Sequence, residues 1–252
     1  MARKPLTVSV VIPVYNEERT FEELFRRVRA VPIDKEIIVV DDGSTDGTRD
    51  LLARIQSGEA KVLFHDRNRG KGAALRTGFA VATGDVLIVQ DADLEYNPQE
   101  YGKLLQPIRD DRADVVFGVR FTPPSRAPYP VSYLINSTIT QLSNLLTGLA
   151  LSDIETCYKV FRRELLEQLH LEENRFGFDP EFTSKIAGLL CRVDEVSVSY
   201  ARRSYREGKK IGMRDAVRAL WCILKYPPRG RDRRATRVRG SRAGLAAPRT
   251  RP

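Results

Sequence analysis

The chain has few of the residue types on which many catalytic centres depend: its 252 residues include two histidines and three cysteines. Cys157, Cys191 and Cys222 are odd in number and lack C-x-x-C spacing, which favours a reducing compartment and argues against a zinc site. With two histidines, a catalytic triad centred on histidine has few candidates. His65 ends a predicted strand, so we expect it to have a structural role.

Several motifs are also missing. No G-x-G-x-x-G follows the first predicted strand, and neither G-x-x-x-x-G-K-[ST] nor G-x-S-x-G occurs in the chain. These absences exclude a dinucleotide-binding fingerprint, a P-loop and a hydrolase nucleophile elbow. No apolar run approaches the roughly 20 residues that cross a bilayer, and the amino terminus lacks the apolar part of a signal peptide. We therefore expect a cytoplasmic protein.

Positive charge is concentrated at the carboxyl end. Residues 229–252 hold nine arginines and one acid, so +8 of the net charge of +9 lies there and the rest of the chain carries +1. Because the folded part is almost neutral, we expect no nucleic-acid partner. Residues 227–252 have little apolar surface to bury, so the sequence predicts a disordered basic tail.

Short apolar strands alternate with helical segments over the first half of the chain. The expected strands are residues 7–12 (ended by Pro13), 36–40, 61–64, 85–90 and 113–119, and the expected helices are 17–31, 48–56, 70–82 and 97–109. After a proline-rich loop, we expect a helix within 131–151, a strand over 192–200 and a helix over 215–226. This order predicts an α/β fold with a doubly wound, mostly parallel sheet and helices on both faces.

Acidic residues follow three of these strands. They are Glu17, the pair Asp41-Asp42 and the motif Asp91-Ala92-Asp93. Ligands of such sheets bind beyond the carboxyl ends of the strands, so one crevice can collect all three. Carboxylates one residue apart suit Mg²⁺ or Mn²⁺ with substrate phosphates as further ligands. The same acids are also typical of solvated turns and helix caps, and the residues alone leave both interpretations open.

Four blocks of sequence resemble family 2 glycosyltransferases with the GT-A fold. They are residues 10–17 (VVIPVYNE), 39–47 (VVDDGSTDG), 68–72 (NRGKG) and 91–93 (DAD). Residues 118–121, 153–161 and 203–210 make the dolichyl-phosphate mannose synthase-like branch the most similar one. The resemblance covers about residues 6–226 and implies a single GT-A domain over 1–226. Its nucleotide-sugar half would be residues 6–120 and its acceptor half residues 121–226.

The resemblance also implies roles for individual residues. The base and ribose of a nucleotide sugar would be held by Pro13, Tyr15, Glu17, Val40 and Asp42, with Lys71 and Ala92 lining the same site. Mg²⁺ or Mn²⁺ would bind Asp91 and Asp93, with Glu95 where the family commonly has a glutamine ligand. Arg120, Arg203 and Lys209 would contact the diphosphate or an acceptor phosphate.

Sugar transfer breaks an anomeric C–O bond through a cation-like transition state, while negative charge grows on the departing diphosphate. A metal on Asp91 and Asp93 would stabilise that charge, and Arg203 would add to it. We expect Asp153 in the site, either as the general base for an alcohol or as a positioning group for a phosphate acceptor. A phosphate monoester has a second pKa of about 6 and is already a nucleophile near neutrality.

The leading hypothesis is an inverting, metal-dependent transferase that moves a sugar from a GDP-mannose or UDP-glucose type of donor to polyprenyl phosphate. The alternatives are a family 2 glycosyltransferase with an alcohol acceptor and a nucleotide-sugar-binding module without catalysis. The helix around Trp221 and the arginine-rich tail predict peripheral contact with an anionic membrane at its cytoplasmic face. For the tail, the alternative is a solvated segment.

Overall fold

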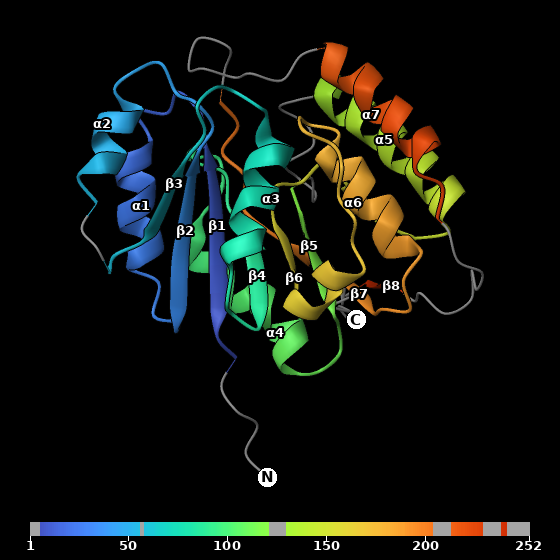
Figure 1. The fold of residues 1–252 in the computed structure, drawn as a ribbon. Helices are drawn as coiled ribbons and strands as arrows, with labels where there is room; N and C mark the ends of the chain where they lie inside the picture. The colour runs from blue at the N-terminus through green and yellow to red at the C-terminus, as the bar shows by residue number, and fades with distance from the viewer. Residues whose placement is uncertain (1–5, 56–57, 121–129, 204–212, 229–237, 241–252) are drawn as a thin grey trace, which may run out of the picture.

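A single sheet organises the chain (Figure 1). The computed structural model describes residues 6–55, 58–120, 130–203, 213–228 and 238–240. Within these ranges eight strands form the sheet in the order β3-β2-β1-β4-β6-β5-β7-β8. The strands are β1 (Val8–Val14), β2 (Lys35–Asp41), β3 (Lys61–Phe64), β4 (Val86–Val89), β5 (Val115–Val119), β6 (Lys159–Arg162), β7 (Val193–Ser197) and β8 (Val238–Gly240). The helices are α1 (Phe21–Arg29), α2 (Thr48–Ala53), α3 (Lys71–Val81), α4 (Tyr101–Arg109), α5 (Pro130–Thr147), α6 (Phe178–Ala187) and α7 (Met213–Lys225), with short 3₁₀ helices η1 (Pro98–Glu100) and η2 (Arg163–Glu167).

The sheet is mostly parallel, as the sequence predicts. β6 runs antiparallel to both of its neighbours, β4 and β5, whereas the other pairings among the described strands are parallel. Because β1 pairs in parallel with β2 on one side and β4 on the other, the carboxyl ends of these three strands lie at one edge of the sheet. The polar residues that follow them therefore meet there.

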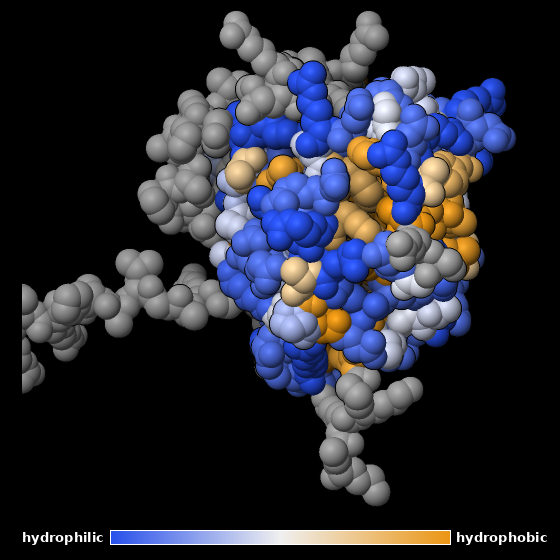
Figure 2. All heavy atoms as spheres, turned by 90° about the vertical axis from the view of Figure 1, so that its left-hand side faces the viewer, coloured by the Kyte–Doolittle hydropathy of each residue, from blue (hydrophilic) through white to orange (hydrophobic). Residues whose placement is uncertain are grey.

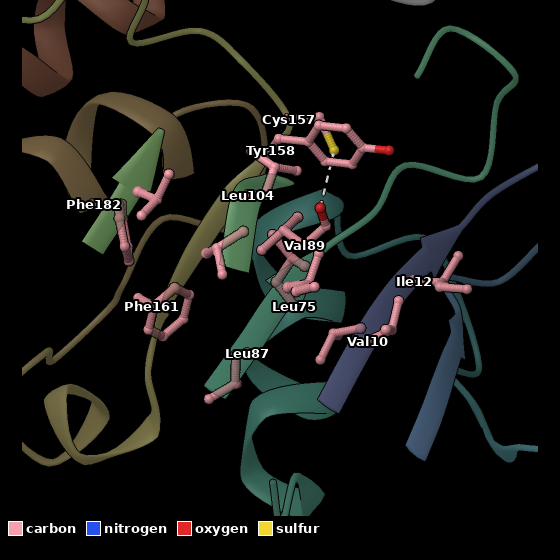
Figure 3. Packing of buried hydrophobic residues seen from close by; sticks show 14 of the residues in the cluster. Val10, Ile12, Leu75, Leu87, Val89, Leu104, Cys157, Tyr158, Phe161 and Phe182 are labelled. Atoms are coloured by element: carbon pink, nitrogen blue, oxygen red, sulfur yellow. Dashed lines mark hydrogen bonds between the residues drawn. The ribbon is translucent and has the colours of Figure 1, made fainter. Parts of the chain in front are cut away.

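Helices cover both faces of the sheet (Figure 1). α3 and α6 lie on one face, where the rings of Phe79 and Phe178 are 6.2 Å apart, and α1 and α4 lie on the other. Side chains of β1, β4, α3, α4 and β6 interlock in the buried core (Figure 3). α5 and α7 lie side by side and pack outside α6. The side of the molecule at the β3 edge is largely hydrophilic, with smaller apolar patches (Figure 2).

The structure differs from the sequence prediction at the end of β1 and at the start of α1. β1 continues through Pro13, which the sequence predicts to end it. Val11 accepts a hydrogen bond from the Gln90 N–H of the β4 side, so Pro13, two residues later, faces that side beyond the last paired residue of β4. The missing proline N–H therefore costs no ladder bond. α1 begins at Phe21 rather than at Glu17, because Glu17 closes a turn with Thr20.

The tail also differs from its prediction over three residues. Residues 238–240 form β8, which pairs in parallel with β7, whereas the sequence predicts disorder throughout 227–252. Residues 229–237 and 241–252 lie outside the described part of the chain. Among the described residues, no helix combines the length and the apolarity that a bilayer crossing requires.

Candidate active site

Lys71 lies where the first turn of α3 meets the end of β4. Its Nζ is 2.6 Å from Oδ1 of Asp91. Burial opposes both charges, but their attraction dominates, and the pKa of Lys71 is raised while the pKa of Asp91 is lowered. The ion pair is therefore formed between a cationic lysine and an ionised carboxylate.

Two glycines fix the direction of Lys71. A Cβ on Gly70 would lie 2.3 Å from the carbonyl oxygen of Asn174, and a Cβ on Gly72 would lie 2.1 Å from that of Glu173. Gly70 also has a φ of +100°, which favours glycine. The Ala73 N–H donates to the Asn174 carbonyl at 3.0 Å, so the start of α3 is held against the loop before α6. This contact positions the lysine between the glycines over Asp91.

Arg203 connects the carboxyl ends of β1 and β4. Its guanidinium lies 2.9 Å from Oε2 of Glu17 and 2.9 Å from Oδ2 of Asp93. The Arg203 backbone N–H donates to Glu95 at 2.7 Å, and the Tyr200 hydroxyl donates to the other oxygen of Glu95 at 3.0 Å. Burial and the negative charges of Asp91 and Glu95 raise the pKa of Asp93 to about 7, despite Arg203. Lys71 and Arg203 therefore neutralise only part of the negative charge of the site.

Asp91 and Asp93 could supply some, but not all, of the ligands of a divalent metal ion. Within the described part of the chain, no group of three or more His, Cys, Asp and Glu side chains is arranged to hold a metal ion. Asp91 and Asp93 offer hard oxygen donors, and the crowding that raises the pKa of Asp93 is the kind of repulsion a cation relieves. Such a pair suits a metal whose other ligands come from water and substrate phosphates. Glu95, predicted as a third ligand, has its oxygens bonded to Tyr200 and Arg203.

Asp153 lies in a second part of the site, bound to Arg120. Two guanidinium nitrogens of Arg120 donate to the two carboxylate oxygens at 2.7 and 2.8 Å, and the Asn136 amide donates to Oδ1 at 3.1 Å. Asp153 is fully buried, and the attraction between the pair raises the pKa of Arg120 despite burial. The Arg120 guanidinium also lies 5.3 Å from the ring centroid of Tyr200. This geometry makes Asp153 a group that positions Arg120.

The predicted nucleotide-binding residues lie on β1 and β2 and in the loops that follow them. Asp42 accepts hydrogen bonds from the backbone N–H groups of Arg69 (2.9 Å) and Gly70 (2.6 Å). Its Oδ1 is 2.7 Å from Nδ1 of His65, whose Nε2 is 3.0 Å from the Thr77 hydroxyl. Asp42 and His65 therefore hold the loop before α3, and nucleotide contacts by Pro13, Tyr15, Val40 and Asp42 stay predictions. Lys209 lies outside the described residues.

Three residues that the sequence did not single out complete the site. The Cys157 thiol accepts the Asp91 N–H at 3.0 Å and lies 3.6 Å from the Val89 carbonyl oxygen, so it fixes the end of β4 (Figure 3). Asn136 donates a hydrogen bond to Asp153. Tyr200 donates one to Glu95, and its ring lies against the guanidinium of Arg120. For Asn136 the available signal was a row of polar residues at helical spacing, which continues with Thr140 and Ser143. Cys157 and Tyr200 gave no such signal.

The sheet and the strand-end carboxylates define a GT-A fold glycosyltransferase. The chain belongs to glycosyl transferase family 2, whose model matches residues 9–170. It is 35% identical over 216 residues to the undecaprenyl-phosphate 4-deoxy-4-formamido-L-arabinose transferase of Pseudomonas aeruginosa (strain LESB58), covering 82% of this chain and 61% of that protein. It is 32% identical over 224 residues to the protein of the same name from Aeromonas hydrophila subsp. hydrophila, covering 86% of this chain and 66% of the relative. The chain thus spans less than two thirds of the length of these relatives.

Solved structures show the same fold. Glucosyl-3-phosphoglycerate synthase of Mycobacterium tuberculosis superposes with a TM-score of 0.67 at 22% identity, over 88% of this chain and 81% of that one. Mannosyl-3-phosphoglycerate synthase of Rubrobacter xylanophilus superposes with a TM-score of 0.69 at 21% identity, over 88% of this chain and 72% of that one. At these identities the likeness concerns the fold.

Replacing Arg203 tests whether the strand-end carboxylates form a cation site. In EDTA, Arg203→Gln leaves Glu17 and Asp93 without this counter-ion, so we expect a loss of about 2 kcal/mol and a Tm lower by about 4–8 °C. Added Mn²⁺ should raise the Tm of the variant more than that of the wild type, as measured by differential scanning calorimetry.

The matched control is Arg192→Gln, which removes an arginine paired with Asp111 and Asp114, residues outside the site. Mn²⁺ should raise the Tm of this control no more than that of the wild type. Equal Mn²⁺ responses in Arg203→Gln and in the control would contradict a cation site at Asp91 and Asp93.

Proposed function

We propose that the protein is an inverting, metal-dependent transferase that moves a sugar from a nucleotide-diphosphate sugar to polyprenyl phosphate. The observation that carries the proposal is the pairing of two cationic groups with the strand-end aspartates, next to a third cation held by Asp153. A site that binds a metal diphosphate on one side and a phosphate on the other needs this distribution of charge.

Lys71 and Arg203 are the groups of the chain that act on the donor side. When bound by Asp91 and Asp93, Mg²⁺ or Mn²⁺ would supply the charge that stabilises the departing diphosphate. With Asp91 and Asp93 bound to that metal, the side chains of Lys71 and Arg203 would be available to bind the diphosphate oxygens. Arg203 also has a buried Nε–H without an acceptor among the described residues. A diphosphate oxygen would satisfy that donor.

Arg120 is the corresponding group on the acceptor side. Asp153 accepts from Arg120 with both oxygens and from Asn136, and it is fully buried, so it is poorly placed to take a proton from an alcohol. A phosphate acceptor needs no such proton transfer, because it is largely dianionic near neutrality. The geometry therefore favours a phosphate acceptor, bound by Arg120, over an alcohol.

The comparisons support this choice. The relatives at 32–35% identity are named undecaprenyl-phosphate sugar transferases. The mycobacterial synthase of the same fold has been crystallised with Mn²⁺ and UDP and with Mg²⁺ and UDP. A lipid-linked acceptor and a nucleotide-sugar donor meet at the cytoplasmic face of a membrane, which is where we place the protein.

Transfer should be measured with UDP-glucose and GDP-mannose as donors and polyprenyl phosphate in detergent as the acceptor. We expect a lipid-linked sugar from one of the donors with Mg²⁺ or Mn²⁺, and none with EDTA. Asp153→Asn should lower kcat by about 10- to 100-fold without changing nucleotide affinity, because it weakens a charged contact that holds Arg120.

Two outcomes would contradict the proposal. Transfer to an alcohol but not to polyprenyl phosphate, abolished in Asp153→Asn while nucleotide still binds, would establish the alcohol acceptor instead. Nucleotide-sugar binding without turnover of any donor would establish a binding module.

An apolar stripe on α7 supports peripheral contact with the membrane that holds such an acceptor. Val217, Trp221 and Leu224 are 62%, 56% and 61% exposed and lie four and three residues apart, on one side of the helix. Ala219, Cys222 and Ile223 on the opposite side are buried. In the sequence, the nine arginines of residues 229–252 follow this helix, and such residues attract anionic headgroups. We propose that α7 lies in the membrane interface with its apolar stripe towards the lipid.

Co-sedimentation with vesicles tests this contact. The variant Val217→Ser/Trp221→Ser/Leu224→Ser should bind phosphatidylglycerol vesicles at least about tenfold more weakly than the wild type, because the buried apolar area is lost. Leu190→Ser, which alters a side chain 84% exposed outside α7, is the control and should bind like the wild type. Equal binding by the triple variant and the wild type would contradict the proposed contact between α7 and the membrane.

A further inference from the structure

Glu155 differs from its neighbours in the segment 153–157. The side chains of Asp153, Ile154, Thr156 and Cys157 are buried, whereas Glu155 is partly exposed. The ends of the segment belong to the two sides of the site, because Asp153 holds Arg120 and Cys157 binds the backbone of Asp91. Glu155 is therefore the middle residue of a short segment that joins the acceptor side to the diphosphate side, and it is the partly exposed residue of that segment.

One oxygen of Glu155 has no hydrogen-bond partner in the part of the chain that the structure describes. Its Oε1 is shielded from solvent, and no described residue donates to it. Lys159 is the nearest lysine in sequence, but its three donors are used by the carbonyls of Ile154 and Thr156 and by Asp179. A shielded carboxyl oxygen without a donor is costly, so its retention needs an explanation such as a ligand.

The surrounding charge indicates which ligand fits. Burial and the carboxylates of Asp179 and Asp153 raise the pKa of Glu155 to about 8, against the opposing effects of Lys159 and Arg120. A phosphate at this position would be repelled by the same acids. A neutral hydroxyl group can donate to the ionised carboxyl and accept from the protonated one. The position therefore suits the sugar rather than either phosphate.

We propose that the Glu155 carboxyl binds a hydroxyl group of the transferred sugar and takes part in selecting that sugar. This inference rests on the proposed function. It assigns a specificity role to a residue between the metal-binding aspartates and the group that holds the acceptor. Removing the carboxyl should then affect binding of the sugar and leave binding of the nucleotide unchanged.

Equilibrium binding separates these effects. The affinities of UDP, UDP-glucose, GDP and GDP-mannose are measured by calorimetry with Mn²⁺ for the wild type, Glu155→Ala and the control Glu36→Gln. Glu36 is bonded to Ser9, Lys61 and Thr83, outside the site. We expect Glu155→Ala to bind the nucleotide sugar about tenfold more weakly, the loss typical of one hydrogen bond, and the nucleotide as the wild type does.

The outcomes distinguish the two proposals. Equal weakening of nucleotide and nucleotide sugar, or no weakening of either, would overturn the role of Glu155 alone. Failure of the wild type to bind any of the four compounds would overturn the proposed function, and this inference with it. The control should match the wild type in all four affinities.

A second measurement needs no ligand. Because the pKa of Glu155 is raised on folding, its contribution to stability is present below pH 4.5 and is lost as the pH rises to about 8. The difference in the free energy of unfolding between Glu155→Gln and the wild type should therefore shift in favour of the variant from pH 5 to pH 9. A variant that loses stability relative to the wild type over this range would show that the ionised carboxyl serves the fold, and would overturn the inference.

Discussion

The concentration of carboxylates at the carboxyl ends of β1 and β4 is the constraint on which the rest of the site depends. Burial and the negative charges of Asp91 and Glu95 raise the pKa of Asp93 to about 7. The chain offsets this repulsion with cations from distant segments, Lys71 on α3 and Arg203 beyond β7. α3 and the segment after β7 are thus tied to the strand ends through charge.

The same ion pairs link the fold to the proposed activity. A metal diphosphate would bring its own cation to the aspartates and its own anion to Lys71 and Arg203, so ligand binding exchanges partners without leaving a buried charge unpaired. On the acceptor side, Asp153 keeps Arg120 in place by two hydrogen bonds. Glu155, between the two sides, has an oxygen that the described residues leave without a donor. A sugar that lies between the donor diphosphate and the acceptor phosphate would lie next to the carboxyl group of Glu155.

The sequence predicted most of the fold, because strand and helix periodicity and the acids at strand ends are local signals. The strand Lys61–Phe64 has the bounds that the sequence predicts. The passage of β1 through Pro13 depends on where β4 stops, and the antiparallel direction of β6 depends on its partners, so neither could be predicted from local pattern. For the site, the sequence singled out Asp91, Asp153 and Glu95. Their partners Cys157, Asn136 and Tyr200 are set by contacts across 17 to 105 residues of sequence, which no local pattern reveals.

The central claim is that Asp91 and Asp93 hold a divalent cation that binds a nucleoside diphosphate. Calorimetric titration of UDP and GDP into the protein, once with Mn²⁺ and once with EDTA, tests it most directly. The account predicts that one nucleotide binds at least about tenfold more tightly with Mn²⁺ and that Asp91→Asn/Asp93→Asn abolishes this gain. Equal affinity with Mn²⁺ and EDTA in the wild type, or an undiminished gain in the double variant, would contradict it.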